Sequence, residues 1–288
     1  MSAQAILFDA PGPRTRRRHL LYSVLAALFV FGVAAVVLWI LWDKGQITPD
    51  KWAPVLTPAA WAQYFIPGIR ATLTAALVAI VASFVLGLLL AMGRMSDLRI
   101  LRILCAVVVE FFRAVPVLIM MLFVFFLLTY TLRLRGGTAP FIGVVVGLIC
   151  YNGAVIAEVI RNGVASLPAG QREAGLSIGL NSSQVRRMIL VPQALTAMMP
   201  TLVSQVVVIL KDTALGYIVL YPELLNSVRQ MGSRFGNMTV AFIAGAVAFI
   251  VINWFITKFA EWLERRLQRR GLAPSRAAKA PPVGATVD

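Results

Sequence analysis

The sequence predicts an all-α membrane protein with about six transmembrane helices, and three observations support this prediction. Of its 288 residues, 59% are hydrophobic and only 14% are charged, whereas a typical soluble domain carries about 25% charged residues. The mean hydropathy is +0.83. The apolar residues gather in six long stretches separated by polar segments. Together these features exclude a soluble enzyme, a disordered protein and a secreted disulfide scaffold.

Each of the six apolar stretches is long enough to cross a bilayer as a helix. A hydrocarbon core about 30 Å thick requires about 20 helical residues. The stretches lack the period-two alternation of a membrane β-strand. The predicted spans are residues 20–42, 66–93, 103–128, 140–160, 196–220 and 238–260.

The first span is expected to be an uncleaved N-terminal anchor that follows a basic cytoplasmic segment, residues 1–19. Its apolar run, from Leu20 to Trp42, exceeds the roughly 7–15 residues of a signal-peptide core. Residues 43–65 combine prolines with Trp and Tyr, which is typical of a segment lying along the outer membrane interface. Residues 261–288 end in a stretch rich in Ala, Pro and Arg and are expected to form a cytoplasmic, partly disordered tail.

Orientation follows from the positions of the basic residues. The formal net charge is +15, and the basic clusters flank apolar stretches, which indicates the positive-inside rule and not nucleic-acid binding. With the N-terminus inside, the inner segments hold nearly three times as many Lys and Arg residues as the outer ones. We therefore expect a multi-pass protein of the cell (cytoplasmic) membrane, in contact with lipid, with both termini cytoplasmic.

The second predicted span carries a small residue at every fourth position. A helix with such a stripe lets neighbouring helices approach closely in lipid. Because a period of four drifts around a helix of 3.6 residues per turn, this stripe should contact more than one neighbour. Its members are Ala71, Ala75, Ala79, Ser83, Gly87 and Ala91.

Ionisable residues inside membrane spans are costly and mark functional candidates. Alternatively, these residues form structural ion pairs or extend to the interface. Pro116, which follows one such group, should kink the third span. No Cys or His pattern forms a disulfide framework or a metal site. The candidates for a polar substrate path are Glu110, Arg113, Glu158, Lys211, Asp212 and Thr213.

The inner loop between the fourth and fifth spans, about residues 161–192, should contain two short helices around a turn. Pro168 suits a helix start and Gly179 the left-handed residue after a helix end. Asn181 or Ser182 can cap the second helix, and Pro192 should end it. Small residues at 174 and 175, beside Glu173, are expected on the surface. The loop is then either a docking element for another protein or an ordinary interfacial loop.

This loop resembles the EAA motif of ATP-binding cassette (ABC) importer permeases, E-A-A-x3-G-x9-I-x-L-P. Glu173, Ala174, Gly179, Ile189 and Pro192 match the motif, whereas Gly175 and Val191 depart from it. Further segments resemble the polar amino-acid uptake subfamily, and within it the glutamate permeases of the GluC/GluD type. In the subfamily's K-D-T-S-L segment, Ala214 replaces the Ser. The resemblance covers roughly residues 60–260, through segments 110–116, 157–163, 168–171, 190–194 and 210–225.

The resemblance implies a permease subunit with no catalytic residue. Residues 66–260 would form the five-helix core of an ABC type I importer, preceded by the anchor. The inner loop would be a coupling helix seated in a separate ATPase. The chain has no phosphate-binding G-x-x-x-x-G-K-[ST] loop, which agrees with ATP and magnesium binding on that partner. The residues expected to contact the ATPase are Gln171, Glu173, Ala174, Gly175 and Gly179.

The expected assembly therefore comprises an ATPase dimer, a second permease that is homologous or identical, and an extracytoplasmic amino-acid-binding protein. The expected substrate is glutamate, with arginine, histidine or glutamine as alternatives, and transport would proceed by alternating access. For an anionic substrate, Arg113 and Lys211 are the expected attracting groups. An ion-coupled secondary transporter, a channel and a membrane scaffold are the alternatives in other classes.

Overall fold

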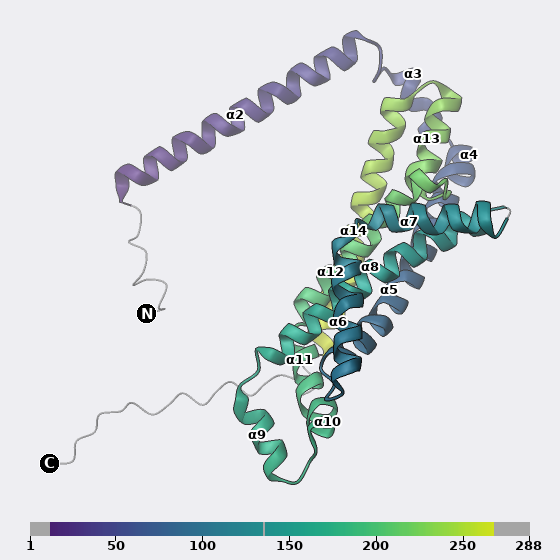
Figure 1. Ribbon diagram of the computed structural model, residues 1–288. Helices are drawn as coiled ribbons and strands as arrows, with labels where there is room; N and C mark the ends of the chain where they lie inside the picture. Colours follow the sequence, from purple (N-terminus) through teal and green to yellow (C-terminus); the bar gives the residue numbers. More distant parts are fainter. Residues whose placement is uncertain (1–11, 135, 268–288) are drawn as a thin grey trace.

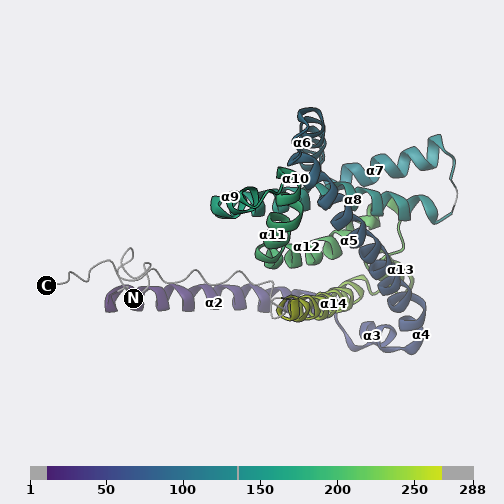
Figure 2. The ribbon, with the colours of Figure 1, turned by 90° about the horizontal axis from the view of Figure 1, so that it is seen from below.

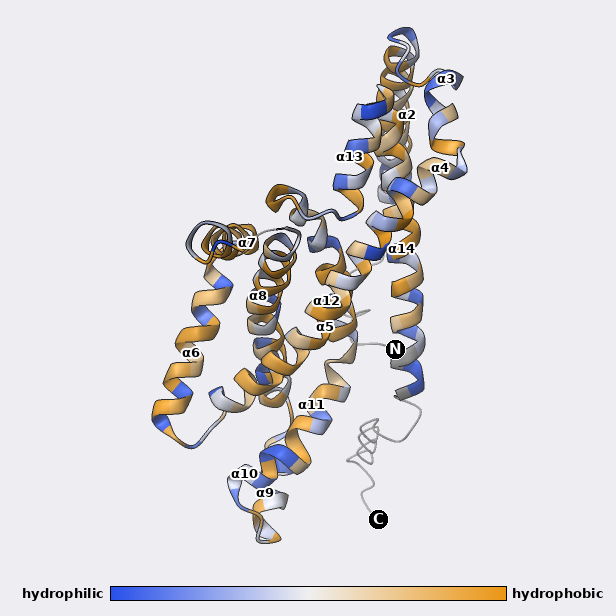
Figure 3. Cartoon of the chain, turned by 90° about the vertical axis from the view of Figure 1, so that its right-hand side faces the viewer, coloured by the Kyte–Doolittle hydropathy of each residue, from blue (hydrophilic) through white to orange (hydrophobic). Residues whose placement is uncertain are grey.

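The computed structural model describes residues 12–134 and 136–267, and this part of the chain contains helices and turns without any strand. Five helices are long and apolar enough to cross a membrane, and a sixth span results if one bent pair counts as one. Hydrophobic residues cover the middle of the long helices, and hydrophilic residues gather towards the two ends of the bundle (Figure 3). The predicted all-α membrane fold is confirmed.

Helix α2 (Pro13–Asp43) corresponds to the predicted anchor and extends away from the other helices (Figure 1). None of its membrane-spanning window is buried in the described chain. An apolar helix with all sides exposed must face lipid or another membrane chain. The helix begins at Pro13, so residues 13–19 are helical and continuous with the predicted anchor. Residues 1–11 lie outside the described part.

The segment predicted to lie along the outer interface folds against the bundle. It contains α3 (Pro49–Trp52), η1 (Ala53–Leu56), α4 (Pro58–Ala60) and η2 (Trp61–Phe65). The last two run without a break into α5 (Ile66–Arg94), so the helix that contains the second span begins at Pro58. Phe65 is buried with Leu224 and Val228. Apolar packing therefore holds residues 55–65 against α13 (Leu224–Phe235) and α14 (Met238–Leu267).

Helix α5 packs closely on α8 (Thr138–Ala165), as its small-residue stripe predicts. Four positions of the stripe, Ala75, Ala79, Ser83 and Ala91, are completely buried. A Cβ added at Gly87 would lie 2.6 Å from Cγ2 of Ile156 on α8. Small side chains therefore set the distance between these two helices.

The third predicted span, residues 103–128, is broken in two. Helix α6 (Arg99–Ala114) is followed by α7 (Val117–Phe126) and η3 (Leu127–Thr131), and the two parts meet at 97°. Figures 1 and 2 show α7 lying across the direction of α6. The predicted kink at Pro116 is confirmed, and it is a sharp break, so this region forms one span only if the bent pair is counted as one. Pro116 lacks an N–H group and forces Val115 into an extended conformation (φ −82°, ψ 128°).

The remaining elements complete the bundle. After α8, the chain forms the inner-loop helices, the fifth and sixth spans, and one amphipathic helix, α13, that no prediction included. Helix α14 continues to Leu267, so residues 261–267 of the predicted tail are helical, and residues 268–288 lie outside the described part. The elements are α9 (Ala169–Ser177), α10 (Ser182–Val185), η4 (Arg186–Leu190), α11 (Val191–Ala197), α12 (Met199–Asp212), η5 (Thr213–Val219), α13 (Leu224–Phe235) and α14 (Met238–Leu267).

Candidate functional site

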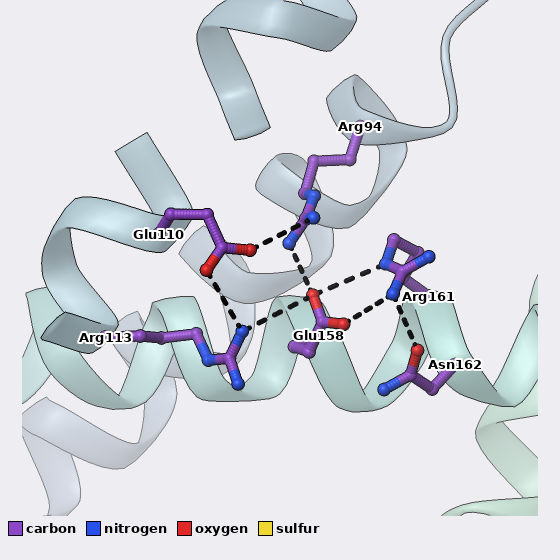
Figure 4. Close-up of polar contacts among 6 residues, drawn as sticks. All are labelled: Arg94, Glu110, Arg113, Glu158, Arg161 and Asn162. Carbon is purple, nitrogen blue, oxygen red and sulfur yellow. Dashed lines mark hydrogen bonds and ion pairs between the residues drawn. The ribbon is translucent and has the colours of Figure 1, made fainter. Parts of the chain in front are cut away.

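Five charged side chains meet where α5, α6 and α8 approach the inner loop, and they are called the charge cluster below (Figure 4). Glu158 on α8 lies at its centre. Arg161 Nη2 is 2.6 Å from Glu158 Oε1, and Arg94 contacts Glu158 Oε2. Arg113 Nη1 is 3.9 Å from Glu158 Oε2 and 3.6 Å from Glu110 Oε2. Arg94 Nη2 also lies 3.4 Å from Glu110 Oε1.

The charge cluster neutralises most of its own charge. The Glu158 side chain is 14% exposed and the Arg94 side chain 12% exposed, so neither is left to bulk water. Three arginines face two carboxylates, and removing one partner from such a group leaves a poorly solvated charge. The ion pairs expected of Glu110 with Arg113 and of Glu158 with Arg161 are both present.

Arg94 is not singled out by the sequence, because it resembles the other basic residues that flank apolar stretches. It lies 64 positions from Glu158, and no local pattern links the two. Only the packing of α5 on α8 brings them together. The cluster thus unites three predicted candidates, Glu110, Arg113 and Glu158, with two arginines from the inner segments.

The other predicted candidates lie elsewhere, at the junction of α12 and η5. Lys211 is exposed and lines a cavity of about 740 Å³ between α12, α13 and α14. The cavity wall is mostly apolar, with Phe242, Phe249 and Ile250 among its residues. Thr213 is buried, and its hydroxyl donates to the Leu210 carbonyl over 2.6 Å. Lys211 and Arg113 therefore do not share one site in this structure.

A pair of amides crosses the middle of the bundle. Gln205 Nε2 on α12 donates to Asn152 Oδ1 on α8 over 2.6 Å, and Asn152 Nδ2 donates to the Leu148 carbonyl over 2.9 Å. Asn152 is completely buried. Side-chain hydrogen bonds of this kind join membrane helices, so the pair ties the fourth span to the fifth.

The inner loop has the local structure that its sequence predicts up to residue 185. Gly179 has φ +87°, the left-handed conformation expected after α9. Asn181 Oδ1 accepts from the Gln184 backbone N–H over 2.9 Å, and Gln184 Oε1 accepts from the Asn181 N–H over 2.8 Å. This reciprocal pair is a capping box. Gln193 Nε2 also donates to Gln171 Oε1 over 3.0 Å, which closes the loop on itself.

Two expectations for the loop are wrong. Gly175 is buried and not on the surface, because α9 packs there on the next helix. A Cβ at Gly175 would lie 2.8 Å from Val185 Cγ2 and 2.9 Å from Ile189 Cδ1. Pro192 does not end the helix either, since the chain continues through η4 into α11. Proline lacks an N–H donor, and its ring would clash with the preceding turn of a regular α-helix. The wider π turn of η4, directly before Pro192, makes room for that ring.

The remaining loop candidates are exposed. Gln171, Glu173, Ala174 and Gly179 all lie on the surface of the loop, which protrudes from one end of the bundle (Figure 1). Three apolar side chains of the loop are exposed beside them, Leu176, Ile178 and Met188. Exposed apolar residues rimmed by polar ones are typical of a protein-binding surface.

A buried acid, Glu223, lies at the opposite end of the bundle and was not among the candidates. Its carboxylate caps α13 by accepting the Leu225 and Asn226 backbone N–H groups, each over 2.7 Å. Burial raises the pKa of Glu223 to about 7, although these two hydrogen bonds favour the charged form. Its signal in the sequence was an acidic N-cap directly before a helix.

Comparison with known proteins agrees with this architecture. Residues 83–269 match the family described as "Binding-protein-dependent transport system inner membrane component". The chain is 41% identical to the glutamate transport system permease protein GluD of Corynebacterium glutamicum, over 83% of this chain and 87% of that protein. It is 34% identical to the glutamate/glutamine/aspartate/asparagine transport system permease protein BztC of Rhodobacter capsulatus, over 85% of this chain and 56% of that protein.

A solved structure shows the same fold. The crystal structure of an amino acid ABC transporter with histidines contains a chain that is 25% identical, with a TM-score of 0.63 over 70% of this chain and 93% of that one. The matched family region, residues 83–269, covers more than half of this sequence. The helical architecture agrees with that of the solved ABC transporter chain. The chain therefore belongs to the family of binding-protein-dependent transport system inner membrane components.

Proposed function

We propose that the chain is the permease subunit of an ATP-driven ABC importer for polar amino acids, with glutamate as its substrate. The observation that supports glutamate is the 41% identity to the permease GluD, which extends over 87% of that protein. Identity to BztC also agrees with an acidic amino acid or its amide. Arginine, histidine and glutamine are the alternatives that the test below separates.

In this proposal the chain forms the membrane path and does not hydrolyse ATP. ATP and magnesium bind to a separate pair of ATPase subunits, a second permease subunit completes the path, and an extracytoplasmic binding protein delivers the amino acid. The inner loop faces the cytoplasm with both termini. Closure of the ATPase pair then moves the loop and rocks the permease between inward-open and outward-open forms.

The exposed face of α9 is the proposed contact with the ATPase. Gln171, Glu173 and Ala174 lie there on a short helix, and exposed apolar side chains at Leu176 and Ile178 add surface that a partner can bury. Gly175 and Gly179 act differently in this proposal. Gly175 allows close packing of α9 on Val185, and Gly179 supplies the left-handed turn.

Lys211 is the proposed attracting group for the anionic substrate. It lines the cavity between α12, α13 and α14 and makes no ion pair with any described residue within 4 Å. Arg113 is a weaker candidate because Glu110 and Glu158 already lie beside it. A cation in a low-dielectric span attracts a carboxylate more strongly than one in water.

Reconstitution of the complex tests the proposal. The chain would be co-expressed with an ATPase, a partner permease and a binding protein, and uptake of radiolabelled glutamate into vesicles would be measured with and without ATP. We expect uptake only with ATP and binding protein, and competition by unlabelled glutamate. Competition by arginine, histidine or glutamine alone would assign the substrate to that amino acid. Uptake by the purified chain in an ion gradient would instead indicate a secondary transporter.

A further inference from the structure

An ion pair joins the inner loop to the turn between α5 and α6. Arg186 Nη1 donates to Asp97 Oδ1 over 2.8 Å, and Arg186 Nη2 donates to Asp97 Oδ2 over 2.7 Å. The two residues are 89 positions apart. A bidentate pair of this kind fixes both distance and orientation, so the first residue of η4 is held at a defined place beside the α5–α6 turn.

The arginine of this pair is largely buried. The Arg186 side chain is only 15% exposed, and its Nε is buried without a hydrogen-bond partner in the described chain. Asp97 therefore accepts both of the hydrogen bonds that orient the guanidinium. The capping box of Asn181 and Gln184 lies less than two turns before Arg186, and Val185 is locked against Gly175. Val185, the residue before Arg186, therefore connects Arg186 to α9 by direct packing.

The aspartate side of the pair is braced as well. The Leu98 backbone N–H donates to Ser96 Oγ over 3.2 Å, and Arg102 Nη1 donates to the Ser96 carbonyl over 3.3 Å. These contacts stiffen the short turn that holds Asp97. Hydrogen bonding from Arg186 lowers the pKa of the Asp97 carboxyl, so the pair stays charged at neutral pH.

The braced turn leads directly into the charge cluster. Arg94, three residues before Asp97, contacts Glu158 on α8 and Glu110 on α6. A displacement at Asp97 thus reaches two further helices through one short segment. Because the Asp97 side chain is 66% exposed, the pair contributes little to stability. Its geometry matters for placing the loop and not for holding the fold together.

We propose that Asp97 and Arg186 are positioning residues that transmit motion of the inner loop to α5 and α6. This inference rests on the proposed function, because it assumes that the loop is moved by an ATPase. Neither residue contacts substrate in this view. Loss of the pair would let the ATPase bind and turn over while the membrane helices follow its motion incompletely.

A double-mutant cycle in the reconstituted complex tests the proposal. Asp97→Ala and Arg186→Ala are each expected to leave ATPase co-purification unchanged and to lower the amino acid moved per ATP by about fivefold, the low end of coupling between sites. The double variant is expected to fall by the same amount, not by the roughly 25-fold of independent effects. Arg187→Ala is the matched control, since Arg187 is the exposed neighbour and should retain the wild-type ratio.

Three outcomes would overturn the inference. They are wild-type coupling in either single variant, multiplicative losses in the double variant, and loss of ATPase co-purification in the single variants, which would make the pair an assembly contact. Failure of the proposed function looks different, because the wild-type complex itself would then move no amino acid with ATP. In that case hydrogen exchange still tests whether the ion pair connects the inner loop to the α5–α6 turn. Arg186→Ala should speed exchange of the backbone amides of residues 95–98, and unchanged exchange would refute this connection.

Discussion

Two charged regions of this protein contrast sharply. In the charge cluster, five side chains from α5, α6 and α8 satisfy one another, and its central carboxylate is only 14% exposed. Lys211, in contrast, lies alone beside a mostly apolar cavity between α12, α13 and α14. A charge inside a span is a functional candidate from sequence alone. The comparison teaches that a charged residue is a better candidate for attracting substrate when no oppositely charged side chain of the described chain already pairs with it.

Removing the centre of the charge cluster should have the largest effect on stability. Glu158→Ala leaves Arg94, Arg113 and Arg161 close together without the carboxylate that balances them. Breaking a buried ion pair costs about 3 kcal/mol, which thermal unfolding in detergent would detect. Glu110→Ala is the matched control, because Glu110 is 61% exposed and its loss should cost less than about 1 kcal/mol. Equal losses in both variants would contradict the distinction.

Replacing the isolated cation should affect transport and spare stability. Lys211→Met is expected to reduce kcat/KM for glutamate by roughly 30-fold, because a hydrogen bond to a charged group contributes about 2 kcal/mol. The unfolding midpoint should stay near that of the wild type, since Lys211 is exposed. Lys211→Arg keeps the charge and should retain most of the activity. Normal glutamate uptake by Lys211→Met would exclude Lys211 as the attracting group.

A third acid extends the comparison, because Glu223 is more deeply buried than Glu158 and is held by backbone N–H groups without an arginine in the described chain. Its pKa rises from 4.5 to about 7 on burial. Since the native chain then holds the proton more tightly than the unfolded chain, this contribution to stability is complete below about pH 4.5 and is lost as the pH rises through 7. From pH 6 to 8 the free energy of unfolding should fall by about 1.4 kcal/mol.

Thermal unfolding across this pH range measures the effect. Glu223→Gln keeps a carbonyl oxygen that can accept from the Leu225 or Asn226 N–H group but removes the titration, so its stability should change less with pH than that of the wild type. A wild-type protein as insensitive to pH as Glu223→Gln would show that Glu223 does not titrate in this range.

Much of the fold was predictable because a membrane helix can be recognised from the residues of its own segment. Each span is a long apolar run, the small-residue stripe of α5 does lie buried, and Gly179 and Asn181 adopt the turn and cap expected of them. Errors arose where the chain depended on distant neighbours. The helix of the second span extends back to Pro58, where Phe65 packs with Leu224 and Val228, and Gly175 is buried because Val185 and Ile189 cover it.

The sequence by itself determined the class of the protein, its apolar spans and the pattern of its inner loop, since these depend on composition and on residues within a few turns of one another. Only the tertiary structure decided which charges are free. Arg94 joins Glu158 and Asp97 joins Arg186 across 64 and 89 positions, while Lys211 finds no such partner in the described chain. Electrostatic pairing depends on distance in space, and that distance is set by helix packing.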